Sequence, residues 1–125
     1  MDKLEQIFFM QQSFNQTLRD QRQLHDIGME EWIQRETLAM VSELSELLDE
    51  VNFKWWKNKK PVSETRVKEE LVDILHFFVS MCLDAGMDAE ELHRMYLEKN
   101  KVNFDRQKGL WGKDYQAPAA DGQEG

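Results

Sequence analysis

Hydrophobic residues recur at intervals of three and four positions along most of the chain, which is the period of an amphipathic α-helix. The first such segment runs from Asp2, a good N-cap residue, to about His25, and Gly28 ends the region. The second runs from about Glu30 to Asn52. Their apolar positions are Leu4, Ile7, Phe8, Phe14 and Leu18 in the first segment, and Ile33, Met40, Val41, Leu44, Leu47, Leu48 and Val51 in the second. Both patterns predict long helices.

Two further helices are predicted after the pattern breaks at Lys54 to Pro61. The third runs from about Glu64, with Ser63 as its N-cap, to Ala85, and Gly86 closes it. Its apolar positions are Val67, Leu71, Ile74, Leu75, Phe78, Val79 and Cys82. The fourth opens at Asp88, has Glu91 in a capping-box-like position and ends before Gly109.

The sequence therefore predicts an all-α fold, a bundle of four helices in one domain over residues 1–113, followed by a disordered polar tail at 114–125. A chain of 125 residues buries only about 65% of its unfolded surface. Phenylalanines crowd all round two of the helices, at Phe8 and Phe9 and at Phe77 and Phe78. We therefore expect a second copy of the chain to complete the bundle.

The balance of charges limits the classes of function. With 24 acidic and 16 basic side chains, the net charge is −8, which argues against nucleic acid as the main partner. The single cysteine excludes an internal disulfide. The longest apolar run, residues 71–83, is too short to span a bilayer, and the N-terminus lacks the features of a signal peptide. A cytoplasmic location is the expectation.

Two pairs of carboxylates stand on the central helices, Glu43 with Glu46 and Glu70 with Asp73. Residues three apart share a helix face, so each pair can present its carboxylates to one point. Glu43 and Glu70 also border apolar stripes, where a carboxylate is costly unless a cation or a partner neutralises it. Oxygen ligands favour Mg²⁺ or Mn²⁺ over zinc. A solvated acidic surface is the alternative, and we expect it for Glu30, Glu31, Glu50, Glu69 and Glu90.

Basic residues gather in two places. Four lysines and two tryptophans lie between residues 54 and 60, where they could bind phosphates and stack on a base, or simply complete the core. Near the end of the fourth helix, Asn100 and Asn103 stand in step with Lys99 and Arg106. Asparagine is a poor residue for a helix interior, so these residues either form a functional polar face or belong to a helix end that frays.

The acidic spacing, E-x-x-E followed after 23 residues by E-x-x-D, resembles the metal-binding signature of the all-α nucleoside triphosphate pyrophosphatases, which include MazG-like proteins. Within that superfamily the sequence is most similar to the dimeric dUTPases. Residues 10–15 (MQQSFN) resemble their L-Q-x-x-L-N motif, and residues 53–57 (FKWWK) resemble W-K-W-W-K. Residues 99–107 resemble K-N-x-x-N-x-x-R-Q, which a glycine follows here at Gly109. Phe53, Met10 and Phe14 depart from these motifs.

The resemblance implies a homodimer that hydrolyses dUTP to dUMP and pyrophosphate with Mg²⁺ or Mn²⁺. The implied metal ligands are Glu43, Glu46, Glu70 and Asp73, with Glu43 or Glu46 also catalytic by orienting water. The implied base-binding residues are Gln11, Asn15 and Trp56; the phosphate-binding residues are Lys57, Lys99, Asn103 and Arg106; and Tyr96 supports the sugar.

Three alternatives remain open. A broader pyrophosphatase of the MazG-like or dCTP type would use the same metal chemistry on other nucleotides. A di-iron bundle would use Asp73 with His76 and Glu90 with His93. A non-catalytic helical protein would use Trp55, Trp56 and Trp111 as anchors for a partner.

Overall fold

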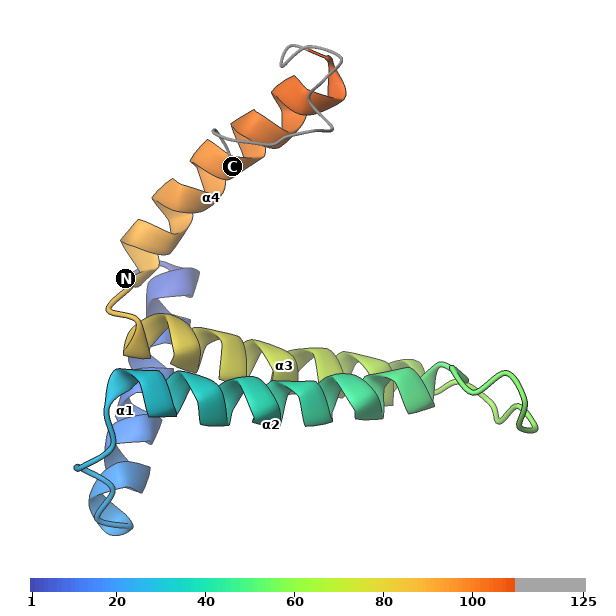
Figure 1. The fold of residues 1–125 in the computed structure, drawn as a ribbon, viewed down its shortest axis with the longest axis horizontal. Helices are drawn as coiled ribbons and strands as arrows, with labels where there is room; N and C mark the ends of the chain where they lie inside the picture. The colour runs from blue at the N-terminus through green and yellow to red at the C-terminus, as the bar shows by residue number, and fades with distance from the viewer. Residues whose placement is uncertain (110–125) are drawn as a thin grey trace. The chain divides into compact units, whose positions relative to one another are not determined.

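The computed structural model describes residues 1–109 of the chain. It contains four α-helices, α1 (Lys3–Gln21), α2 (Met29–Glu50), α3 (Glu64–Asp84) and α4 (Ala89–Gln107), and the described residues include no strand (Figure 1). The all-α prediction and its four helices are confirmed. The tail predicted at 114–125 lies outside the described residues. The chain divides into two compact units, one of Met1–Ala89 and one that begins at Glu90, and each is described by itself.

Two helix starts follow from the expected caps. Asp2 accepts a hydrogen bond from the Glu5 backbone N–H at 2.8 Å, and the Glu5 carboxylate accepts one from the Asp2 N–H at 2.9 Å, which is a complete capping box. The Ser63 hydroxyl accepts from the Arg66 N–H at 3.3 Å. Gly28 is the N-cap of α2, although it has no side chain to bind the free N–H groups.

The helices α1, α2 and α3 are each followed by a residue in the left-handed region, namely Gln23 (φ 56°), Asn52 (φ 59°) and Gly86 (φ 83°). In each case the next N–H donates to a carbonyl five residues back, a Schellman motif: Leu24 to Arg19, Phe53 to Leu48 and Met87 to Cys82. The expected end of the first helix at about His25 is therefore wrong by four residues, because Gln23 ends it before Gly28 is reached.

In the unit Met1–Ala89, α2 and α3 lie side by side as an antiparallel pair joined by residues 51–63, and α1 packs against α3 (Figure 1). Asn52 closes the connecting loop: its side-chain amide donates to the Lys60 carbonyl and accepts from the Lys60 N–H, both at 3.0 Å. The buried apolar side chains of this unit are few, and Val79 is the most enclosed of them. They are Phe8, Val79, Cys82 and Ala89.

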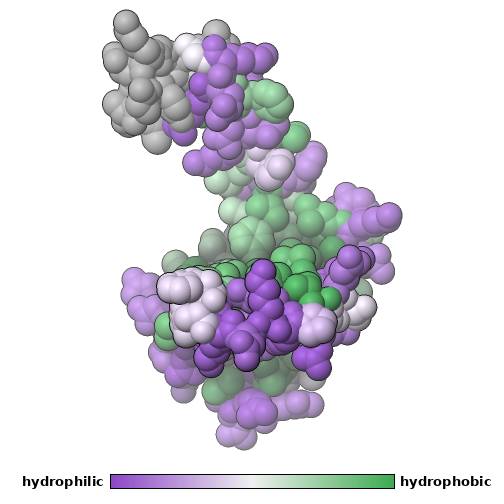
Figure 2. All heavy atoms as spheres, turned by 90° about the vertical axis from the view of Figure 1, so that its right-hand side faces the viewer, coloured by the Kyte–Doolittle hydropathy of each residue, from purple (hydrophilic) through white to green (hydrophobic). Residues whose placement is uncertain are grey.

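Many large apolar side chains of this unit are instead exposed. On α3 alone, Leu71, Val72, Leu75 and Phe78 each expose two fifths or more of their surface. In the space-filling view, hydrophobic side chains gather behind the polar tip of the α2–α3 loop (Figure 2). None of the described helices is long and apolar enough to cross a membrane.

Candidate functional site

Three carboxylates from α2 and α3 converge on one point. Oxygen atoms of Glu43, Glu46 and Glu70 all lie within 4.8 Å of one another. The helical spacing places Glu43 and Glu46 on one face of α2, and the antiparallel packing of α3 brings Glu70 opposite them. Glu43 and Glu70 are half-buried while Glu46 is exposed, as their positions at the border of the apolar stripes predict. We call Glu43, Glu46 and Glu70 the acidic cluster.

Glu70 has the least favourable environment of the three carboxyl groups. Its Oε1 atom is buried and has no hydrogen-bond partner. Burial, and then the neighbouring carboxyl groups of Glu43, Glu46 and Asp73, raise the pKa of Glu70 from 4.5 to about 7. A partnerless oxygen among like charges is the environment that a bound cation would relieve.

The donor set of the acidic cluster fits a hard divalent cation. All three side chains offer oxygen, and no histidine joins the group in the part of the chain that the structure describes. The ligand oxygens of one octahedral Mg²⁺ lie about 3 to 4 Å apart, so small side-chain rotations suffice.

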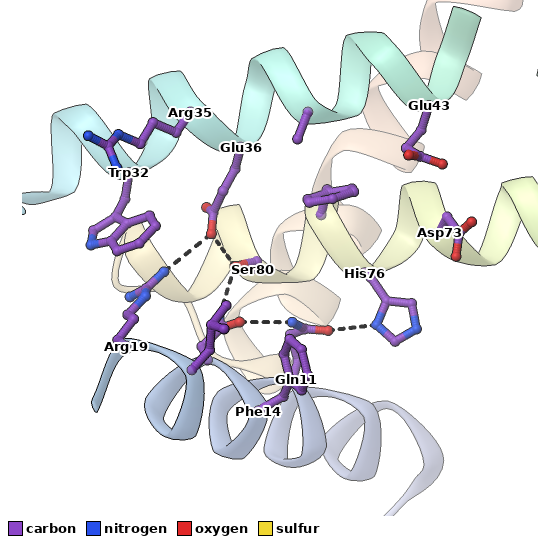
Figure 3. A pocket seen from close by; sticks show the side chains of 14 residues that line it. Gln11, Phe14, Arg19, Trp32, Arg35, Glu36, Glu43, Asp73, His76 and Ser80 are labelled. Carbon is purple, nitrogen blue, oxygen red and sulfur yellow. Dashed lines mark hydrogen bonds and ion pairs between the residues drawn. The ribbon is translucent and has the colours of Figure 1, made fainter. Parts of the chain in front are cut away.

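A cavity of about 560 Å³ adjoins the acidic cluster. Glu43 and Asp73 line one end, so Asp73 faces the cavity although its carboxylate is outside the group of three (Figure 3). Arg19, Trp32 and Arg35 line the other end, where the Arg19 guanidinium stacks 3.8 Å above the Trp32 ring. The cavity thus extends from carboxylates to an arginine-rich end.

The two predicted base-reading amides lie on the wall of this cavity. Gln11 donates to Asn15 Oδ1 at 2.9 Å, and Asn15 donates to Ser80 Oγ at 2.8 Å. The Gln11 oxygen contacts His76 Nδ1 at 2.8 Å. Gln11 is buried and Asn15 is half-buried, so their amide planes are held by the protein rather than by water (Figure 3).

A buried charged network continues from Ser80. The Ser80 hydroxyl donates to Glu36 Oε2, which also accepts from Arg19 at 3.2 Å. Arg19 donates through both terminal nitrogens to Asp84, at 2.9 and 3.1 Å. One guanidinium therefore serves two carboxyl groups. Burial, followed by the nearby Asp84, raises the pKa of Glu36 from 4.5 to about 7.

Sequence reasoning missed the residues of this network, although each lies at helical spacing from a residue that was singled out. Ser80 follows His76 by four residues, Arg19 follows Asn15 by four, and Glu36 precedes Glu43 by two turns of α2. Each missed residue thus shares a helix face with a residue already singled out. Glu50 was also misjudged: it is buried and pairs with Arg66 at 3.5 Å instead of facing solvent.

The basic loop between α2 and α3 forms a second concavity. Lys54, Lys57 and Lys60 line a hollow of about 250 Å³ together with Asp49, Asn52, Phe53 and Asn58. Trp56 packs edge-on against Trp55 and Phe53, yet 58% of Trp56 and 85% of Trp55 remain exposed. The alternative that the two tryptophans complete the core of this unit is therefore wrong. Trp56 is not among the residues that line the 560 Å³ cavity.

The remaining predicted residues lie on α4. Lys99, Asn103 and Arg106 follow one another at intervals of four and three residues, so they share a helix face, and Tyr96 stands one turn before Lys99. Tyr96, Lys99 and Asn103 are exposed. All four belong to the second unit, and their roles stay predictions.

Comparison with known proteins bears on this site. A family model described as dUTPase matches residues 3–88, which is more than half of the chain. The chain belongs to this family. The residues that match the dUTPase family include the acidic cluster, Asp73, both amides and Lys57, whereas α4 lies beyond them.

Three bacteriophage proteins are similar in sequence. A dCTP pyrophosphatase of Enterobacteria phage T4 is 37% identical over 87 residues, covering 58% of this chain and 51% of the relative. A dCTP pyrophosphatase of phage LZ5 is 32% identical over 74 residues, covering 59% and 43%. A DNA replication protein of phage T4 is 35% identical over 81 residues, covering 54% and 21%. The chain thus spans about half of the first relative and less than half of the other two, and no solved structure matches it.

Proposed function

We propose that this protein is a nucleoside triphosphate pyrophosphohydrolase that depends on Mg²⁺ or Mn²⁺ and prefers dUTP, releasing dUMP and pyrophosphate. The observation that carries the proposal is the acidic cluster at the end of a cavity walled by two fixed amides. Membership in the dUTPase family and the likeness to phage dCTP pyrophosphatases support the same reaction class.

Glu43, Glu46 and Glu70 would hold the metal, with Asp73 beside them on the cavity wall. When bound, the cation supplies the positive charge that a triphosphate needs at an acidic protein and activates water for hydrolysis. Glu43 is half-buried on α2 and faces both the cluster and the cavity. A carboxylate in that position can accept a hydrogen bond from the attacking water and orient it toward phosphorus.

The polar groups further along would bind the rest of the nucleotide. Gln11 and Asn15 lie where they can hydrogen-bond a pyrimidine edge in the cavity. We assign phosphate contacts to Lys57, Lys99, Asn103 and Arg106, stacking on the base to Trp56 and support of the sugar to Tyr96. The exposed side chains of Lys57 and Trp56 on the α2–α3 loop are accessible to a ligand.

A homodimer is part of the proposal. The exposed apolar side chains of α1 and α3 give each chain a surface that a second copy would cover. An apolar cavity of about 500 Å³ lies among them, and it is lined by Ile7, Met10, Gln11, Phe14, Val72, Leu75 and His76. Gln11, Phe14 and His76 line the larger cavity too, so a partner at this surface would stand next to the substrate.

A dCTP-type pyrophosphatase is the second candidate, because two of the phage relatives carry that name. It differs from the first candidate only in the base that the amides accept. A non-catalytic helical protein would have the same helices but would hydrolyse no nucleotide.

The test is release of pyrophosphate from dUTP, dCTP, dTTP, dATP, dGTP and UTP, each with Mg²⁺ and with EDTA. We expect metal-dependent turnover that is fastest with dUTP. Faster turnover of dCTP than of dUTP would favour the dCTP-type pyrophosphatase over the dUTP-preferring enzyme. The absence of turnover with every nucleotide would contradict the proposal that the protein is a pyrophosphohydrolase. A Glu46→Gln variant serves as the inactive control.

A further inference from the structure

Five side chains from three helices form one continuous line of hydrogen bonds along the cavity wall. The line runs from Glu36 on α2 through Ser80 on α3 to Asn15 and Gln11 on α1, and returns to α3 at His76 (Figure 3). Gln11 and Ser80 expose only 8% and 3% of their surface. Water therefore has little access to the polar groups of these two residues.

The line has only one consistent direction, which is set at Glu36. The Oε2 atom of Glu36 already accepts a hydrogen bond from Arg19 at 3.2 Å. A proton on the carboxyl group therefore belongs on Oε1, and Oε2 stays an acceptor whether Glu36 is charged or neutral. The Ser80 hydroxyl has a single hydrogen and must give it to that oxygen.

The direction then passes through both amides. Since Ser80 has spent its hydrogen, it can only accept, so Asn15 must turn its NH₂ group toward it and its oxygen toward Gln11. Gln11 must likewise donate to Asn15 and present its oxygen to His76. The His76 Nδ1 atom must therefore carry a hydrogen, which leaves Nε2 as the open nitrogen of the neutral ring.

We propose that Ser80 and Glu36 are positioning residues that fix the orientation of the Asn15 and Gln11 amides and the tautomer of His76. Its meaning for catalysis rests on the proposed function. Asn15 and Gln11 each use one amide hydrogen within the line, and the second hydrogen of each amide can donate to a carbonyl oxygen of the base. Uracil has two such oxygens and cytosine has one. Neither Ser80 nor Glu36 has to contact the base for this preference to arise.

The first arm of the test measures the His76 tautomer by long-range ¹H–¹⁵N NMR at a pH where the ring is neutral. His76 is assigned with a His76→Gln variant, since the chain has only three histidines. In the unaltered protein we expect the hydrogen on Nδ1. In Ser80→Ala the amides lose their fixed direction, and we expect a shift toward the Nε2–H form. Glu36→Gln keeps an acceptor oxygen for Arg19 and Ser80, so it should retain the Nδ1–H form.

The second arm measures kcat/KM for dUTP and for dCTP. Ser80→Ala should lower the ratio of the two values about tenfold, because a misdirected amide leaves a polar group unpaired against the base. Ser80→Thr, which keeps the hydroxyl, should restore the ratio. Ser13→Ala, the same change at an exposed position of α1, should leave it unaltered.

The two arms separate the inference from the proposed function. An Nε2–H tautomer in the unaltered protein, or an unchanged tautomer and selectivity in Ser80→Ala, would overturn the inference while pyrophosphatase activity stands. Because the NMR arm needs no turnover, it decides the direction of the line even in a protein that hydrolyses no nucleotide. That lack of turnover would contradict the proposed function alone.

Discussion

The carboxyl groups of Glu36 and Glu70 have raised pKa values because their surroundings do not fully compensate a negative charge. Each has a pKa of about 7 rather than the ordinary 4.5, with burial as the largest cause. At Glu36 the second cause is Asp84, with which it shares the guanidinium of Arg19. At Glu70 it is the other carboxylates of the proposed metal site, and no basic side chain is among the causes. Below pH 7 a proton therefore neutralises both carboxyl groups, although Glu36 also pairs with Arg19.

The stability of the metal-free protein should therefore depend on pH near neutrality. Between pH 4.5 and 7 the folded protein keeps protons on Glu36 and Glu70 that the unfolded chain releases. The contribution of these two groups to the free energy of unfolding is thus full below pH 4.5 and is lost as the pH rises through 7. For Glu36 the change is about 3 kcal/mol at most. Urea unfolding from pH 5 to 8 in EDTA measures it.

Two controls divide this effect between the groups. Glu36→Gln should remove the part of the pH dependence that belongs to Glu36, with or without metal, because an amide cannot titrate. Mg²⁺ should flatten only the part that belongs to Glu70, since a cation stabilises the charged carboxylate. An equal pH slope in the unaltered protein, Glu36→Gln and Glu70→Gln would show that neither carboxyl group holds a proton at neutral pH.

Glu70→Gln should also separate stability from activity. Above pH 7, where Glu70 is charged, the neutral amide removes repulsion from Glu43 and Glu46, so the melting temperature at pH 8 in EDTA should rise. Loss of an anionic metal ligand should lower kcat/KM by about two orders of magnitude or more, and Mg²⁺ should stabilise the variant less than the unaltered protein. Melting curves with and without Mg²⁺, together with pyrophosphate release, check both. Full activity in Glu70→Gln would remove Glu70 from the metal site.

At the scale of helices, the sequence predicted beginnings better than endings. The caps at Asp2 and Ser63 are readable because a side-chain oxygen must stand in that position. Gly86 was readable as an ending for a comparable reason, since glycine adopts positive φ without strain. Gln23 and Asn52 end their helices in the same geometry, but glutamine in particular gives no such signal, and the end of the first helix was expected later, at about His25.

Gln23→Gly should consequently stabilise the protein. Gln23 holds φ at 56°, where a side chain is strained and glycine is not. The expected gain in the free energy of unfolding is about 0.5 to 1 kcal/mol, measured by chemical denaturation. Gly86→Ala is the matched control: no atom lies within 4 Å of the added Cβ, so a loss of similar size would come from the backbone alone. A destabilised Gln23→Gly variant would mean that the glutamine side chain supports the turn.

The candidate site was also predictable only in part, namely where its residues lie on one helix. Spacing within one helix predicted that Glu43 and Glu46, and separately Glu70 and Asp73, share a face. Which carboxylates meet depends on the register between α2 and α3, which spacing does not specify, and the structure brings together three of the four. The link from Ser80 to Glu36 joins residues 44 positions apart on different helices, so no local pattern encodes it.

At the scale of the whole molecule, the proposed second copy explains why the core of the unit Met1–Ala89 is small. Residues such as Ile7, Val72 and Leu75 recur at core spacing on their helices, yet each is 39% exposed or more. Such a surface destabilises a lone chain in water unless another apolar surface covers it. The proposed dimer would place its interface beside Gln11 and His76, so assembly and substrate binding would be linked.

Stability should accordingly depend on protein concentration. A dimer that loses its partner on unfolding melts at a higher temperature when the chain is more concentrated, because mass action favours the associated state. Light scattering should give twice the chain mass of 14.9 kDa at micromolar concentration. Val72→Glu, a charge placed among the exposed apolar residues of α3, should lower that mass toward the monomer and reduce turnover together with it. A monomeric mass and a melting temperature that is independent of concentration would require the apolar surface of α1 and α3 to have another occupant.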